Sequence, residues 1–213
     1  MNDMHRIALS AAVLLAAVPA GAAAWKVATL YWDRPVRHGA ALLIAVSLGL
    51  FAWALLVMPM SPILAASLLL ALTLVTLTAI DVVVFRLPDP LTLPLVVAGL
   101  IVAAWLPDGR LVDHLIGAIA GYGVLAALQW GFERLRGYEG IGLGDAKLLA
   151  ASGAWLGWSP LPSVLLIACA AAFLQLALMT IIQRRSAFRD RLAFGGPLCL
   201  ATWIVWLHGP LVS

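Results

Sequence analysis

Long apolar runs separated by short polar segments make up most of the chain. Eight of these runs are predicted to be helices, at residues 7–25, 39–57, 63–81, 90–106, 113–130, 146–158, 162–182 and 193–208. Several approach the roughly 20 residues that a helix needs to cross the hydrocarbon core of a bilayer, and the sixth is short. The pattern predicts an all-α protein: a polytopic membrane helical bundle with about eight transmembrane helices.

Composition and charge agree with this prediction and add an orientation. The 213 residues are 64% hydrophobic and 11% charged, whereas soluble domains carry about 25% charged residues. If all eight runs span the bilayer, eleven of the 13 Lys and Arg residues lie on one side, and only Arg6 and Arg110 lie on the other. The side rich in Lys and Arg is cytoplasmic, so both termini are expected outside. Because topology explains the basic residues, they do not indicate a nucleic-acid partner.

The first run also resembles a secretory signal peptide. Its apolar core is followed by small residues at 19–24 that suit a cleavage site. Such a signal would carry Lys26, Arg34 and Arg37 across the membrane, against the charge bias. We therefore expect the run to be retained as a membrane span.

Two acids stand at the edges of apolar runs. Asp81 ends the run at 63–81, and Asp145 follows a glycine-rich loop and opens the sixth run. An Asp near a bilayer centre costs about 2.5–3.5 kcal/mol on insertion scales, and an intramembrane acid is by default a functional candidate. The expected topology places both acids near the cytoplasmic face.

A pair of carboxylates at a partly desolvated site tends to share one proton, because both cannot easily ionise together. One carboxylate can then take a proton from water while the other protonates a substrate carbonyl. If the fold brings Asp81 and Asp145 together, the expected chemistry is that of an aspartic protease.

The loop before Asp145 contains Gly140, Gly142 and Gly144. Glycine permits positive φ and close backbone approach, so a substrate strand could lie beside Asp145. The alternative is that the glycines only form a tight turn and that Asp145 is the N-cap of the sixth helix. Lys147 either attracts the charge of Asp145 or simply follows the charge bias.

Two long motifs match a known family. The segment from Asp81 to Pro94 (DVVVFRLPDPLTLP) resembles the Asp-containing segment of type IV prepilin peptidases, which continues Leu-Pro-Asp-x-Leu-Thr-Leu-Pro. The segment from Glu139 to Gly157 resembles the Gly-x-Gly-Asp segment of that family. Residues 194–198 (FGGPL) are a looser echo of its Pro-Phe-Gly-Pro stretch, with Ala193 in place of the first Pro.

This resemblance implies a membrane aspartic endopeptidase of the bacterial inner membrane. It would cleave the basic leader of type IV prepilins, or of the pseudopilins of type II secretion, after a glycine at the cytoplasmic face, with Asp81 and Asp145 as the catalytic pair. Gly142, Gly144, Lys147 and Glu139 are expected near the substrate. Residues 1–60 would form two N-terminal spans with a short cytoplasmic loop, and residues 61–213 the six-helix protease core. Neither the sequence nor the resemblance indicates an oligomeric state.

No metal or organic cofactor is expected. Cys169 and Cys199 lie inside apolar runs and form no Cys-x-x-Cys motif. Bifunctional relatives carry paired Cys-x-x-Cys motifs in a cytoplasmic domain after the first span and also methylate the new N-terminus. The corresponding loop here, residues 26–38, is short and has no Cys, so an accompanying N-methyltransferase activity is not expected.

Three other interpretations use the same residues. A presenilin-like intramembrane protease also contains Gly-x-Gly-Asp, but it pairs this motif with a Tyr-Asp and a Pro-Ala-Leu that are missing here. An ion- or proton-coupled transporter could use both acids, although such folds usually show internal repeats and helix breaks at the midplane. A non-catalytic membrane scaffold is the third.

Overall fold

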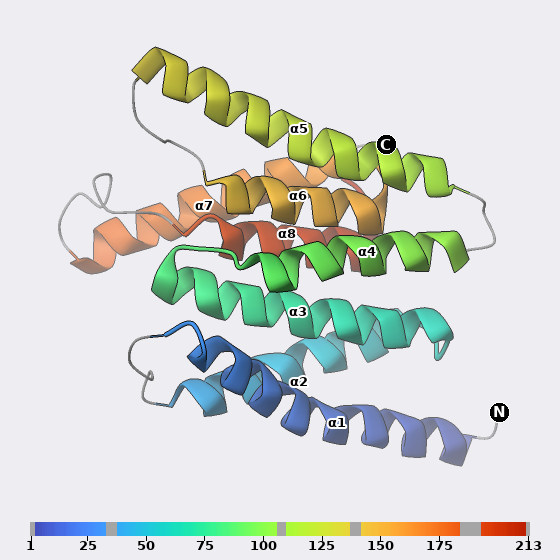
Figure 1. Ribbon diagram of the computed structural model, residues 1–213. Helices are drawn as coiled ribbons and strands as arrows, with labels where there is room; N and C mark the ends of the chain where they lie inside the picture. The colour runs from blue at the N-terminus through green and yellow to red at the C-terminus, as the bar shows by residue number, and fades with distance from the viewer. Residues whose placement is uncertain (1–2, 33–37, 106–109, 137–141, 184–192, 212–213) are drawn as a thin grey trace. The chain divides into compact units, whose positions relative to one another are not determined.

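The computed structural model describes residues 3–32, 38–105, 110–136, 142–183 and 193–211. These parts of the chain form eight α-helices and contain no strand: α1 (Asp3–Thr29), α2 (Gly39–Val57), α3 (Pro62–Val84), α4 (Asp89–Trp105), α5 (Leu111–Arg136), α6 (Leu143–Leu156), α7 (Leu161–Gln183) and α8 (Gly195–His208). Each predicted helix is present, so the all-α prediction is confirmed (Figure 1).

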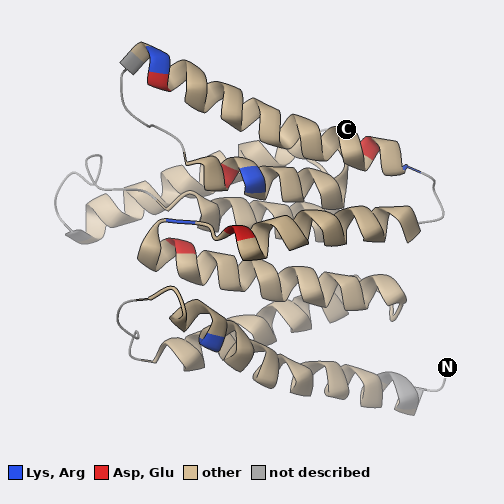
Figure 2. Cartoon of the chain, in the orientation of Figure 1, with Lys and Arg blue, Asp and Glu red and all other residues tan. Residues whose placement is uncertain are grey.

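Five helices are long and apolar enough to cross a membrane, namely α1, α2, α3, α5 and α7. The described parts of α4, α6 and α8 are shorter. Charged residues gather near the helix ends, and the long middle stretches carry none (Figure 2). The chain is therefore a multi-pass membrane protein.

The chain forms two compact units, Met1–Val84 and Phe85–Ser213. The expected functional division at residue 60 stays a prediction. In the first unit, α1, α2 and α3 all contact one another. Their shared core contains Ala24, Leu43 and Val75, one residue from each helix.

In the second unit, α6 is the central helix and contacts α4, α5, α7 and α8. Its described residues from Leu148 to Trp155 are all buried. A helix that is apolar and buried on every side belongs in the middle of a bundle. Figure 1 shows α4 and α5 running alongside it.

Glycines allow α5 and α6 to pack closely. A Cβ atom at Gly117 would lie 2.6 Å from the carbonyl oxygen of Gly153, and one at Gly121 would lie 2.5 Å from that of Leu149. No side chain fits at these positions without moving a backbone. Small residues at helix contacts are the usual means of association in membranes.

Trp155 connects α6 to two other helices. Its Nε1–H donates to the carbonyl oxygen of Leu95 on α4, at 2.9 Å. Its ring meets that of Trp206 on α8 edge to face, with centroids 5.4 Å apart. Ser152 and Thr202 add a buried hydroxyl hydrogen bond of 2.6 Å between α6 and α8. These contacts fix the position of α6, and therefore of its first turn.

Candidate functional site

Asp81 lies on the last turn of α3, in the first compact unit, and its side chain is only 4% exposed. Leu77, Leu74 and Leu70 precede it on the same helix face at spacings of three and four residues, and all three are buried. A buried acid among apolar side chains is expensive to place there, and it is by default a candidate for a functional site.

The chain leaves α3 through an unusual turn. Phe85 directly follows the helix with φ of 54°. This left-handed position after a helix is usually occupied by Gly or Asn, because a Cβ atom is disfavoured there. Strained non-glycine residues cluster at functional sites, where the surrounding structure holds them. No sequence pattern predicts this feature of the segment between Asp81 and α4.

Asp145 is the third residue of α6 and is half-buried. Its backbone N–H donates to the carbonyl oxygen of Gly142 at 3.0 Å. Gly142 occupies the N-cap position, with φ −75° and ψ 135°. The alternative that Asp145 is the N-cap is therefore wrong. The carboxylate stays close to the start of the helix, because Oδ2 would lie 3.8 Å from a Cβ atom at Gly142.

The first turn of a helix suits a carboxylate. Its backbone N–H groups lack partners within the helix, and the macrodipole is positive there. Asp145 thus lies in a local field that favours negative charge. Asp81 lies at the opposite, carbonyl end of its own helix.

The two described glycines of the loop act differently from each other. Among the described residues, the glycines with positive φ are Gly157 and Gly209, so neither Gly142 nor Gly144 uses this freedom. Gly144 instead allows a close approach, since a Cβ atom there would lie 3.1 Å from that of Leu87. The neighbour at this close approach is thus the chain's own segment before α4. Glu139 and Gly140 lie outside the described residues.

Lys147 forms an ion pair with Asp89, the first residue of α4, with 2.5 Å between Nζ and Oδ1. The two side chains are 26% and 54% exposed. Sequence reasoning offered Asp145 or the charge bias as explanations for Lys147 and did not find this partner. The two residues are far apart in the chain and share no spacing signal, so only the fold could show the pair.

The described residues contain no group of three or more His, Cys, Asp or Glu side chains that could hold a metal ion. The chemistry available at the two motifs is that of carboxylates. One is buried at the end of a helix and the other is half-buried at the start of another. Acids in two such different environments are suited to different roles in proton transfer.

Comparisons with known proteins point to one family. A family model described as "Type IV leader peptidase family" matches residues 68–177, a range that contains both acids. Similar curated proteins carry the name "Prepilin leader peptidase/N-methyltransferase". One from Aeromonas hydrophila is 46% identical over 149 residues, which cover 70% of this chain and 51% of the relative. Another, from Burkholderia pseudomallei (strain 1026b), is 50% identical over 126 residues, covering 59% of this chain and 40% of the relative.

A third relative, from Escherichia coli (strain K12), is 42% identical over 154 residues, which cover 70% of this chain and 68% of the relative. The matched residues therefore span about half the length of the first relative, two fifths of the second and two thirds of the third. No solved structure matches. The comparisons favour neither a transporter nor a presenilin-like protease.

Proposed function

Since the chain belongs to the type IV leader peptidase family, we propose that it is a membrane aspartic endopeptidase. Its substrate is a prepilin or pseudopilin, and it removes the basic leader at the cytoplasmic face. The observation that carries this proposal is the placement of two acids within the matched residues. Asp81 is buried at the end of α3, and Asp145 lies in the first turn of the central helix α6.

In the proposed reaction, the two acids share one proton and activate a water molecule. The ionised carboxylate takes a proton from water, and the resulting hydroxide attacks the carbonyl carbon of the scissile peptide bond. The protonated carboxyl gives its proton to the carbonyl oxygen. When the tetrahedral intermediate collapses, the C–N bond breaks and the leaving nitrogen receives a proton from the acid that took one from water. The other carboxylate takes back the proton that it gave to the carbonyl oxygen, so the shared proton is restored.

Covalent connectivity supports bringing the two acids together. Leu87 lies against Gly144, next to Asp145, and Asp81 precedes Leu87 by only six residues. Six residues reach at most about 20–22 Å when fully extended. The short connection therefore permits the pairing of Asp81 with Asp145 that the reaction requires.

We further propose that all eight helices cross the bilayer, with the termini outside and Asp81 and Asp145 near the cytoplasmic face. At 1.5 Å per residue, α6 and α8 are about 21 Å long, shorter than a hydrocarbon core of about 30 Å. For α6 this is acceptable because nine of its residues are buried against other helices. The excess of Lys and Arg predicts that the loops next to Asp81 and Asp145 face the cytoplasm, and a basic leader would remain on that same side.

A cleavage assay with the purified protein tests the proposed function. The protein in detergent is incubated with a synthetic prepilin segment that contains the basic leader, the scissile glycine and the first apolar residues. We expect a single new N-terminus directly after the glycine, identified by mass spectrometry. A matched peptide with the glycine replaced by leucine should stay intact. If the first peptide is not cleaved, the proposed function is wrong.

A further inference from the structure

Two contacts hold the segment before α4 against the start of α6. Asp89 forms its ion pair with Lys147, and Leu87 lies against Gly144. All four residues belong to the second compact unit. The contacts are independent of each other, since one is ionic and the other is a close backbone approach.

The spacing of the four residues makes the two contacts one continuous contact between the segment before α4 and the start of α6. Gly144 and Lys147 are three residues apart, so they lie on the same face of α6. Their partners, Leu87 and Asp89, are two residues apart on the opposing segment. Asp145 directly follows Gly144 and points about 100° away around the helix. The contact therefore holds the turn that carries Asp145.

The ion pair is too exposed to contribute much to the stability of the fold. Asp89 is 54% exposed and Lys147 is 26% exposed, and ion pairs of this kind contribute little to the free energy of unfolding. Their effect on local geometry is different, because the pair restrains a short segment that includes the strained Phe85. That segment directly follows the last turn of α3, where Asp81 lies.

We propose that Asp89 and Lys147 are positioning residues for the reaction. Their ion pair fixes the segment that follows Asp81 to the turn of α6 that carries Asp145, and thereby positions Asp145 for the reaction. This inference rests on the proposed function and deepens it. It also gives Lys147 a role different from direct contact with the substrate.

Kinetic measurements on neutralised variants test this role. Asp89→Asn and Lys147→Gln should each lower kcat for prepilin cleavage about tenfold or more, because small displacements of reacting groups are costly, while KM changes little. The double variant should be no slower than the worse single variant, since both changes break the same ion pair. Lys147→Arg keeps the cation and should retain most of the activity. Glu133→Gln and Arg110→Gln, which change exposed charges on or beside α5, serve as matched controls.

Several outcomes would overturn the inference. Additive losses in the double variant would mean that the two residues act separately. A large loss with Lys147→Gln beside normal activity in Asp89→Asn would assign Lys147 a direct role instead. Unchanged kcat in both single variants would remove any role for the pair.

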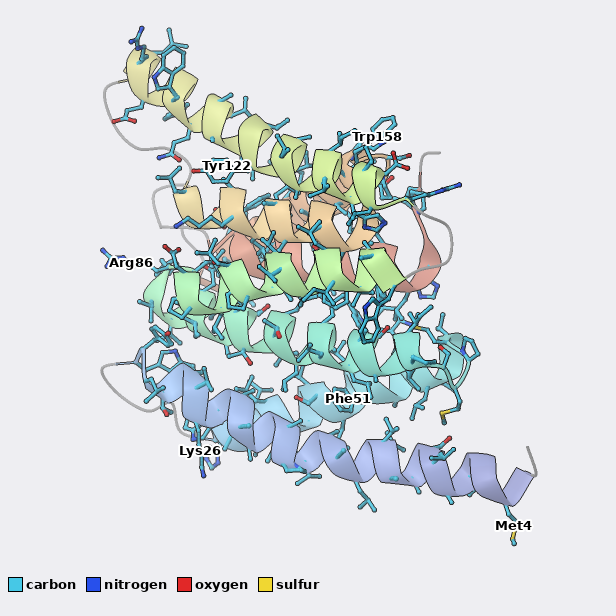
Figure 3. All side chains as sticks on the ribbon, turned by 45° about the vertical axis from the view of Figure 1, so that its right-hand side comes forward. Met4, Lys26, Phe51, Arg86, Tyr122 and Trp158 are labelled. Atoms are coloured by element: carbon cyan, nitrogen blue, oxygen red, sulfur yellow. The ribbon has the colours of Figure 1, made fainter. Side chains whose placement is uncertain are left out.

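A second measurement does not depend on activity, so it separates this inference from the proposed function. Arg86 is exposed and points away from the helices (Figure 3), and the peptide bond after it is a trypsin site. Loss of the ion pair should free the segment and speed tryptic cleavage after Arg86, measured as the rate of appearance of the fragment that ends there. Asp89→Asn and Lys147→Gln should show this increase, and Glu133→Gln should not. Equal rates in all variants would contradict the proposed restraint even if the wild-type protein cleaves prepilin normally.

Discussion

At the scale of single residues, the structure separates the roles of residues that the sequence presents together. Gly142 has an extended backbone at the N-cap, and Gly144 provides room for Leu87. Lys147 binds Asp89 rather than standing free beside Asp145. A short motif therefore contains a cap, a packing contact, an acid and an ion pair, and each has its own physical cause.

The close approach at Gly144 leads to a testable expectation. A valine at this position adds a Cβ atom 3.1 Å from that of Leu87, followed by two methyl groups. We expect Gly144→Val to displace the segment before α4 and to lower kcat about tenfold or more, with a smaller loss for Gly144→Ala. Gly131→Ala on α5 is the control, because a Cβ atom there meets nothing within 4 Å. Full activity of Gly144→Val would show that the Leu87 contact has no influence on the site.

The sequence predicted the two acids but only part of their surroundings. Asp81 and Asp145 could be found because an isolated carboxylate in an apolar chain needs an explanation. The Asp89–Lys147 pair and the positive φ of Phe85 could not be found, since they depend on contacts between distant residues and on a turn without Gly or Asn. Glu139 remains a prediction, because it lies outside the described residues.

At the scale of helices, the second unit depends on the close packing of α5 against α6. The contact runs along Gly117 and Gly121 on one helix and Gly153 on the other. Trp155 then connects α6 to α4 and α8. The helices themselves could be predicted from apolar runs, with every end within six residues of the observed one. Their packing partners could not, because all eight runs look alike in composition.

Substitution of Gly153 tests this packing. A Cβ atom there would collide with the carbonyl group of Gly117, so α5 and α6 must move apart. We expect Gly153→Ala to destabilise the protein by about 1–3 kcal/mol, seen as a lower midpoint of thermal unfolding in detergent. Gly123→Ala on α5 meets nothing within 4 Å and should be neutral or slightly stabilising. Equal midpoints for the two variants would contradict the close contact.

Trp155 gives a second test at this scale. Trp155→Phe removes the donor to the Leu95 carbonyl and part of the edge-to-face contact with Trp206. We expect a loss of about 1–3 kcal/mol in the same unfolding experiment. Trp105→Phe is the matched control, since Trp105 is 84% exposed. A smaller loss at Trp155 than at Trp105 would show that α6 is held by other contacts.

At the scale of the whole molecule, the chain is a multi-pass membrane protein, and the distribution of its basic residues predicts an orientation. The all-α class and the family could be predicted because apolar periodicity and two long motifs are strong signals. Apolar length alone does not determine the number of spans, since α4, α6 and α8 are shorter than a bilayer core. The proposed reaction requires the segment before α4 to face the cytoplasm.

Cysteine labelling tests that orientation. In a background without Cys169 and Cys199, Arg110→Cys should react with an impermeant thiol reagent added to intact cells. Arg86→Cys should react only after the membrane is opened. Both positions are exposed in the structure, so access alone does not distinguish them. Labelling of position 86 from outside would place the acids on the wrong side for a cytoplasmic leader peptide.

The most direct test of the central claim is the cleavage rate of Asp81→Asn and Asp145→Asn on a prepilin peptide. Each variant should lose at least about a thousandfold in rate, and the double variant should be no worse, because residues that act as a unit are not additive. Asp113→Asn is the control for removing an acid elsewhere in the bundle. Asp113 accepts a hydrogen bond from Trp158, and this variant should cleave the peptide normally. Circular dichroism should show that all variants are folded. Substantial cleavage by either folded single variant would contradict the assignment of Asp81 and Asp145 as the catalytic pair.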